Sequence, residues 1–163
     1  MSEGCTGQNG TVARIRKSGL GIEVPNGWTY AQQPDATIIS FNDAMLAVST
    51  FDQGAASEAS REGALAALVN LLGVTAPRHK VAWARPSKKS RVGTLELWFW
   101  QADDVTKGLK KGPVLLVGTE LPDKTWLLAA GFVPDDDKSD SDKAILGAVE
   151  SIRPTPPSPP ASP

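Results

Sequence analysis

Two uninterrupted apolar segments constrain this chain most strongly. Val114–Gly118 and Trp126–Val133 are apolar at nearly every position. Both have the length of a strand, and neither approaches the ~18–20 apolar residues that a membrane-spanning helix needs. A strand with one wet face alternates apolar and polar residues, so a continuously apolar strand indicates a sheet that is covered on both faces. The sequence therefore predicts a layered domain with this sheet in its middle.

The other strand signals are alternating segments separated by turn residues. Leu20–Val24 places its apolar side chains on one face, and Pro25–Trp28 then supplies the proline, asparagine and glycine of a turn. Thr37–Phe41 and Met45–Phe51 flank Asn42–Ala44 and predict a hairpin. Further strands are expected at Val12–Arg16, Lys80–Ala84 and Thr94–Gln101, with turns at Lys110–Pro113 and Leu121–Lys124.

Two helices are expected. The first begins at a Ser57 or Ser60 cap and ends at Gly73, and the second begins near residues 140–141 and stops before Pro154. Short turns favour antiparallel pairing, and two helices are too few for parallel β-α-β crossovers. The predicted class is therefore α+β, an antiparallel sheet flanked by helices on both faces (an α/β/α sandwich). The apolar stripes of the helices are Leu65, Leu68, Val69 and Leu72, and Ile145, Val149 and Ile152.

Length and composition predict one domain with two polar ends. The chain has 163 residues, 40% of them hydrophobic, and at this size a folded domain buries roughly 70% of the surface its unfolded chain exposes. Residues 1–11 are small and polar, so we expect a flexible arm that is no secretory signal. Residues 12–153 form the predicted domain. Residues 154–163 are rich in proline, which favours a disordered tail.

The sequence carries no recognisable catalytic or metal-binding motif. It has one histidine, His79, and one cysteine, Cys5, which cannot form an internal disulfide or a thiolate metal site. The acidic run Asp135–Asp142 lacks the glycine and glutamate that a calcium loop requires. We therefore predict no enzymatic activity, no cofactor and no metal. A small enzyme that uses His79 is the alternative within the enzyme class.

The net charge is only −1, but basic residues are grouped in one segment and two tryptophans share one strand face, which suggests a docking surface for a partner. No acidic residue lies between Glu62 and Glu96, and within this segment Arg85–Arg91 is predicted to be a basic loop. Core packing is the favoured interpretation of the five tryptophans, and Trp98 and Trp100, which share a strand face with Glu96, are the two most expected to be partly exposed. The basic segment lacks interleaved aromatic residues, which argues against nucleic acid as the partner. The predicted contact residues for a protein partner are Trp98, Trp100, Arg85, Lys88, Lys89 and Arg91, and Lys107, Lys110 and Lys111 could extend the basic loop.

Several segments together resemble the PsbP-like family. They are Gly19–Trp28, a strand that leads into a P-x-G-W turn, the alanine-rich helix after the second hairpin, and the closing Ala148–Arg153. The family includes the PsbP subunit of photosystem II, a yeast Ran-binding protein, bacterial DcrB-type lipoproteins and type VI secretion effector chaperones. The resemblance implies an α/β/α sandwich with a non-catalytic binding role, and it supplies no catalytic residues. The proline tail and the lack of a signal segment depart from the lipoprotein relatives.

The sequence thus predicts a cytoplasmic, non-catalytic protein-binding module, an adaptor or chaperone-like subunit of a bacterial assembly or secretion system. Its expected partner is another protein, with no nucleic acid and no integral membrane segment, and the chain itself is a monomer or a homodimer. The alternative is a cell-envelope lipoprotein anchored through Cys5, because bacterial lipoproteins carry an acylated cysteine followed by a small polar tether such as the one after Cys5.

Overall fold

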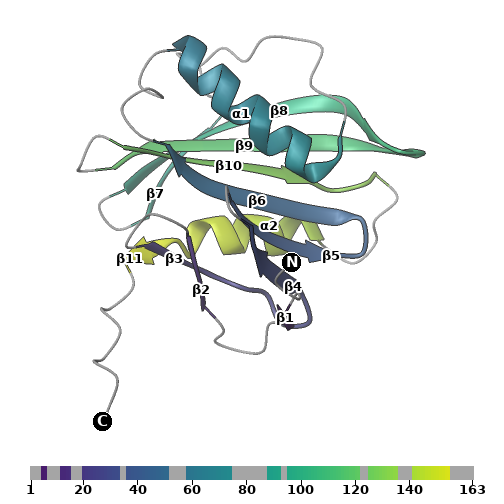
Figure 1. Ribbon diagram of the computed structural model, residues 1–163, viewed down its shortest axis with the longest axis horizontal. Helices are drawn as coiled ribbons and strands as arrows, with labels where there is room; N and C mark the ends of the chain where they lie inside the picture. Colours follow the sequence, from purple (N-terminus) through teal and green to yellow (C-terminus); the bar gives the residue numbers. More distant parts are fainter. Residues whose placement is uncertain are drawn as a thin grey trace.

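The computed structural model describes residues 5–6, 12–15, 20–33, 36–51, 58–74, 88–92, 95–121, 125–135 and 141–154. These residues form an eight-stranded sheet, a three-stranded sheet and two helices (Figure 1). The helices are α1 (Glu58–Leu72) and α2 (Ser141–Glu150). The strands are β1 (Cys5–Thr6), β2 (Val12–Arg14), β3 (Leu20–Glu23), β4 (Thr29–Gln32), β5 (Thr37–Phe41), β6 (Ala44–Phe51), β7 (Lys88–Val92), β8 (Leu95–Lys107), β9 (Lys110–Glu120), β10 (Trp126–Phe132) and β11 (Arg153–Pro154).

The apolar segment predicted at 126–133 forms the middle of the large sheet. The strand order is β1-β4-β5-β6-β10-β9-β8-β7, and every neighbouring pair is antiparallel. All seven residues of β10 are buried, and β10 pairs with β6 on one side and β9 on the other. The prediction of a sheet covered on both faces is confirmed for this strand.

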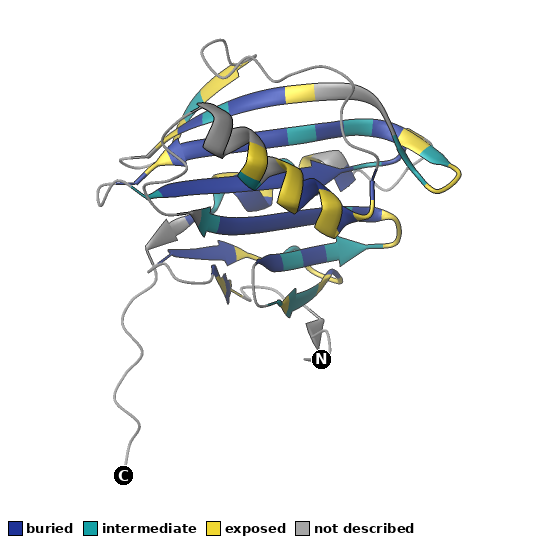
Figure 2. Ribbon diagram, turned by 45° about the horizontal axis from the view of Figure 1, so that its top comes forward, coloured by how far each residue is buried: buried dark blue, intermediate teal, exposed yellow. Residues whose placement is uncertain are grey.

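Each face of the large sheet has its own hydrophobic cluster. On one face α1 packs against β10 and β6 (Figure 2). Its buried side chains Leu68, Val69 and Leu72 belong to the same hydrophobic cluster as even-numbered residues of β10 such as Leu128. On the other face the odd-numbered residues of β10 meet a layer built from α2 and the small sheet β11-β3-β2. Because successive residues of a strand point to opposite faces, one apolar strand serves both clusters.

The predicted helix-flanked sandwich, with its α/β/α layering, is wrong. Strands dominate the described residues, and helices of 15 and 10 residues are too small to form complete layers. Eight strands spaced about 4.8 Å apart make a sheet about 34 Å wide, whereas one helix is about 10–12 Å across. The face opposite α1 is accordingly shared between α2 and a second sheet, which α2 contacts through β3. No helix of the described ranges is long and apolar enough to cross a membrane.

Glycine turns explain several of the local predictions. Gly73 has a φ of 72° directly after α1, as expected of a helix stop, and Gly27 has a φ of 86° in the predicted Pro25–Trp28 turn. That turn is closed by the amide of Trp28, which donates to the carbonyl oxygen of Pro25 at 3.1 Å. The hairpin around Asn42, whose φ is 52°, is also confirmed.

The predicted turn at Lys110–Pro113 is wrong, because these residues lie inside β9. The chain reverses earlier, at Gly108, whose φ is 59°. Pro113 lies opposite the irregularity in the β8 register between Ala102 and Val105, where a residue without an amide hydrogen is tolerated. Gly112 is buried against the chain that follows β10: a Cβ at this position would lie 2.0 Å from the backbone oxygen of Val133. Gly112 therefore serves close packing, and neither residue reverses the chain.

Short strands extend the fold toward both ends of the chain. Cys5–Thr6 forms β1 on β4, within the predicted arm, and Arg153–Pro154 forms β11 on β3, where the tail was expected to start. The predicted strand Lys80–Ala84 lies outside the described residues. Helix α2 ends at Glu150, before Pro154 as expected, and Ile145, Val149 and Ile152 are buried.

Candidate functional site

The candidate site lies on β7, which is the end strand of the large sheet among the residues that the structure describes. The sequence predicted a basic loop from Arg85 to Arg91, and this is wrong for Lys88–Val92, which pairs antiparallel with β8. Arg85 lies outside the described residues. An end strand presents one row of backbone donors and acceptors away from its sheet. Lys88, Lys89 and Arg91 are thus carried on an edge strand and not on a loop.

The register of this pair sorts the side chains onto two faces. Lys89 is opposite Trp98 and Arg91 is opposite Glu96, and Trp98 packs against the cluster under α1. On the other face Lys88 is opposite Phe99, and its ammonium group lies 5.7 Å from the centre of that ring. The face that carries Lys89 and Arg91 therefore combines two cations, one indole and one carboxylate, which we call the β7–β8 cradle.

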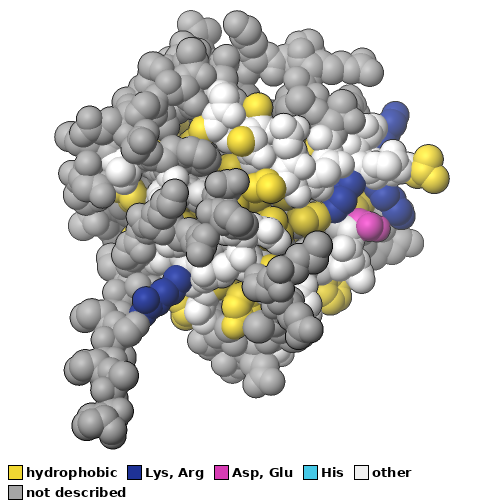
Figure 3. Space-filling view, viewed as in Figure 1, with side chains coloured by type: hydrophobic (Ala, Val, Ile, Leu, Met, Phe, Trp, Pro, Cys, Tyr) yellow, Lys and Arg dark blue, Asp and Glu magenta, His cyan; other side chains and the backbone are white. Residues whose placement is uncertain are grey.

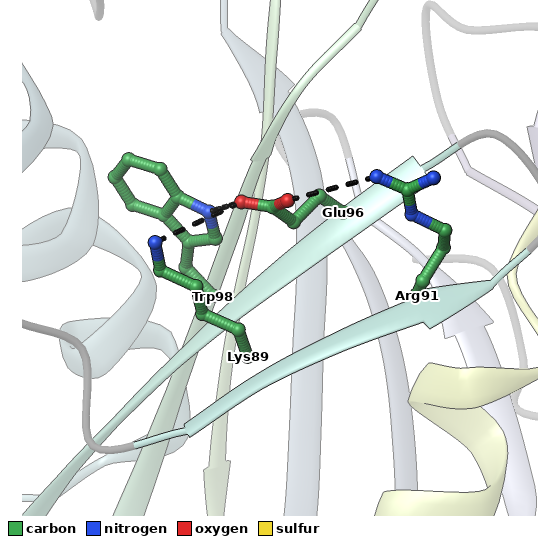
Figure 4. Close-up of polar contacts among 4 residues, drawn as sticks. All are labelled: Lys89, Arg91, Glu96 and Trp98. Atoms are coloured by element: carbon green, nitrogen blue, oxygen red, sulfur yellow. Dashed lines mark hydrogen bonds and ion pairs between the residues drawn. The ribbon is translucent and has the colours of Figure 1, made fainter.

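Glu96 is the centre of the β7–β8 cradle. The indole Nε1 of Trp98 donates to Glu96 Oε1 at 2.6 Å, and Lys89 Nζ lies 4.0 Å from the same oxygen. The guanidinium nitrogen of Arg91 lies 4.0 Å from Glu96 Oε2 (Figure 4). Lys89 Nζ also lies 5.1 Å from the centre of the Trp98 ring, within range of a cation–π interaction. One carboxylate thus accepts a hydrogen bond and faces two cations.

Trp98 of the β7–β8 cradle packs against two further tryptophan rings. Trp98 is half-buried, and its ring lies 6.1 Å from Trp100 and 6.3 Å from Trp126, edge to face in both cases. Gly118 is directly opposite Trp98 on β9, and a Cβ there would lie 3.3 Å from the Trp100 ring. Trp100 is 4% exposed and follows the favoured interpretation of core packing, whereas Trp98 is the one of the two that is partly exposed. Trp100 is therefore part of the core that orients Trp98.

A second basic group lies at the far end of β8. The β8–β9 hairpin projects beyond the sheet in Figure 1, and basic side chains gather at that end in Figure 3. Lys107, Lys110 and Lys111 belong to this hairpin, with Leu109 fully exposed at its tip. From Phe99 to Lys107 is eight residues, about 26 Å along a strand, so these lysines do not extend the β7–β8 cradle.

Lys107 is partly enclosed by the body of the domain. Its Nζ lies 2.7 Å from the sulfur of Met45, and a Cβ on Gly73, after α1, would lie 4.0 Å from its Cε. Burial lowers the pKa of Lys107 from the ordinary value of 10.5, and the nearby Asp43 carboxylate acts in the opposite direction. This residue therefore joins the hairpin to the body of the domain and is a poor candidate for a contact residue.

The remaining predicted candidates are not part of this site. His79 lies outside the described residues, and Cys5 belongs to β1, at the opposite edge of the sheet from β7. Of the acidic run, Asp135 donates its amide to the carbonyl oxygen of Lys111, and α2 begins at Ser141. Over the described ranges no three histidine, cysteine, aspartate or glutamate side chains are grouped to hold a metal ion.

Sequence reasoning overlooked Glu96 as a site residue. The available signal was the spacing of the two strands: Lys88–Val92 and Leu95–Gln101 are separated by Gly93-Thr94, a link of hairpin length. Pairing across that link sets Arg91 opposite Glu96 and Lys89 opposite Trp98. In the sequence, Glu96 indicated only which face of its strand is exposed. Its partners across the strands follow from the register.

No protein-family model matches this chain, and no curated protein sequence matches it significantly. Membership of the PsbP-like family stays a prediction.

Proposed function

We propose that this chain is a non-catalytic protein-binding module, an adaptor or chaperone-like subunit of a bacterial assembly or secretion system, and that it docks its partner on the β7–β8 edge. The observation that carries the proposal is the β7–β8 cradle. Lys89 and Arg91 lie on β7, the end strand, and Lys89 lies over the half-buried Trp98 of the neighbouring strand β8. Arginine and tryptophan are the residue types most enriched where protein partners bind tightly. The resemblance to the PsbP-like family points to the same kind of role.

The edge also favours a particular mode of docking. An extended segment of a partner can add to an end strand through main-chain hydrogen bonds, and its side chains then meet those of the edge. Charges on an edge strand discourage unspecific pairing between sheets. The same cations select a partner whose own charge is complementary. The basic edge is therefore protected from aggregation and selective at once.

Charge reversal tests this proposal. A tagged chain expressed at its native level in its own host should retain a stoichiometric protein partner, identified by mass spectrometry. Lys89→Glu combined with Arg91→Glu should weaken retention at least tenfold, since two attractive contacts become repulsive. The matched control is Lys111→Glu with Lys143→Glu, which makes the same change of charge at exposed positions outside the β7–β8 cradle and should retain the partner. A chain that purifies alone, or equal retention by all three proteins, would contradict the proposal.

A further inference from the structure

Glu96 is an isolated acidic residue in a long basic stretch. It is the only aspartate or glutamate between Glu62 and Asp103, a stretch in which arginine and lysine occur repeatedly. Its carboxylate meets Lys89, Arg91 and the Trp98 indole together. An acidic group from another molecule would be recognised by these same three groups.

The two cations are only loosely held by Glu96. Both ion-pair distances are 4.0 Å, and the side chains of Lys89 and Arg91 are 56% and 75% exposed. Exposed ion pairs of this kind contribute little to stability, so releasing them costs the fold little. The short contact is the hydrogen bond from the indole of Trp98. Lys89 and Arg91 are therefore available to a stronger or better placed acidic ligand.

We propose that Glu96 is an internal substitute for a carboxylate of the partner, and that the partner contacts the β7–β8 cradle through an extended segment with aspartate or glutamate at alternate positions. This inference rests on the proposed function and names the chemistry of the partner. Lys89 and Arg91 are two residues apart on one face of β7, about 6.6 Å along the strand. Carboxylates at alternate positions of an added strand have the same spacing and lie on one face, so each can face one cation.

The presence of Glu96 then limits the affinity of the β7–β8 cradle. Its single negative charge offsets one of the two positive charges, and it competes for the indole donor. Removal of that charge should strengthen the binding of an acidic segment by about fivefold at low salt, the effect of one charge at about 4 Å in water. The gain should shrink as salt is added, because the groups are exposed and screened.

A peptide-binding measurement tests the inference. The probe is a fluorescein-labelled Thr-Glu-Thr-Glu-Thr-Glu-Thr peptide, with a Thr-Gln-Thr-Gln-Thr-Gln-Thr control, and fluorescence anisotropy is followed at low salt. The Glu96→Gln variant should bind the acidic peptide about three- to tenfold tighter than the wild-type protein, and the control peptide should show no such gain. Equal or weaker binding by Glu96→Gln, or an equal gain for the control peptide, would overturn the inference.

A second readout uses the wild-type chain and does not depend on how the variant folds. In a ¹H–¹⁵N spectrum, the indole N–H signal of Trp98 should move when the acidic peptide binds, because its hydrogen bond to Glu96 changes. Binding that leaves this signal unmoved would also overturn the inference. The proposed function has a separate outcome: if the native partner is lost from the Lys89→Glu/Arg91→Glu protein while Glu96→Gln gains nothing, the docking site stands and only the role of Glu96 fails.

Discussion

Gly112 offers the sharpest test of how the base of the β8–β9 hairpin is held. A Cβ on this residue would lie 2.0 Å from the backbone oxygen of Val133 and 2.9 Å from its carbonyl carbon. The φ of Gly112 is not positive, so alanine is conformationally allowed and its cost is purely steric. The β9 backbone must move by about 1 Å, which strains the packing by about 1–3 kcal/mol. The same movement disturbs the neighbouring 2.7 Å hydrogen bond from the Asp135 amide to Lys111, worth about 1 kcal/mol.

Gly112→Ala should therefore lower the free energy of unfolding by about 2–4 kcal/mol. Urea unfolding followed by tryptophan fluorescence measures this, with circular dichroism as the second probe. Gly147→Ala is the matched control: it lies on the exposed side of α2 with nothing within 4 Å of a Cβ, and it should gain up to about 1 kcal/mol from helix propensity. A loss of less than about 0.5 kcal/mol for Gly112→Ala would refute the close-packing explanation.

Three further variants test other parts of the fold. Because the pKa of Lys107 is lowered in the folded state, the unfolded chain binds more protons than the folded chain between the two pKa values, and the unfolding free energy should rise as pH rises toward 10.5. Lys107→Met should remove this rise, which urea midpoints at mildly and strongly alkaline pH would measure; an identical alkaline slope in both proteins would count against it. Leu109→Ser, at the exposed hairpin tip, should change the unfolding free energy by less than about 0.5 kcal/mol. Leu128→Ala, in the cluster under α1, should cost about 2–5 kcal/mol in the same assay, and a small effect there would show that β10 is not central to the core.

Periodicity predicted the core of this protein well. The alternation in Leu95–Gln101 separated Leu97 and Phe99 from Trp98 and Trp100, and the structure places these pairs in opposite clusters. The spacing of Leu68, Val69 and Leu72 likewise identified the buried face of α1. These patterns are local, because a strand or helix buries one face regardless of which element covers it.

The layering could not be predicted in the same way. The sequence showed two helices and several strands, but the face opposite α1 is shared between α2 and a small sheet in which β3 pairs with both β2 and β11, and the β3–β11 pairing joins distant parts of the chain. Two strands also lacked a clear signal. Thr29–Gln32 is mostly polar and half-exposed, and Lys88–Val92 is charged because it lies at the edge of the sheet.

The sequence predicted most of the residues of the candidate site but not how they pair. Lys89, Arg91 and Trp98 were named from charge and exposure, and the structure brings these three together. The prediction included Trp100, which is buried, and omitted Glu96, which is central to the site, because only the cross-strand register distinguishes the two. Sequence reasoning finds the residue types of an edge before it can find their pairing.

The most direct test of the account is site-specific photo-crosslinking in the native host. A photoreactive amino acid replaces Ser90 on β7, which lies between Lys89 and Arg91 with its side chain on the opposite face of the sheet and within reach of a segment added to this edge, and in a second strain it replaces Ala67 on the exposed side of α1. The account predicts one discrete crosslinked protein partner from position 90 and none from position 67. A partner captured from position 67 and not from position 90 would contradict the assignment of the β7–β8 edge as the docking surface.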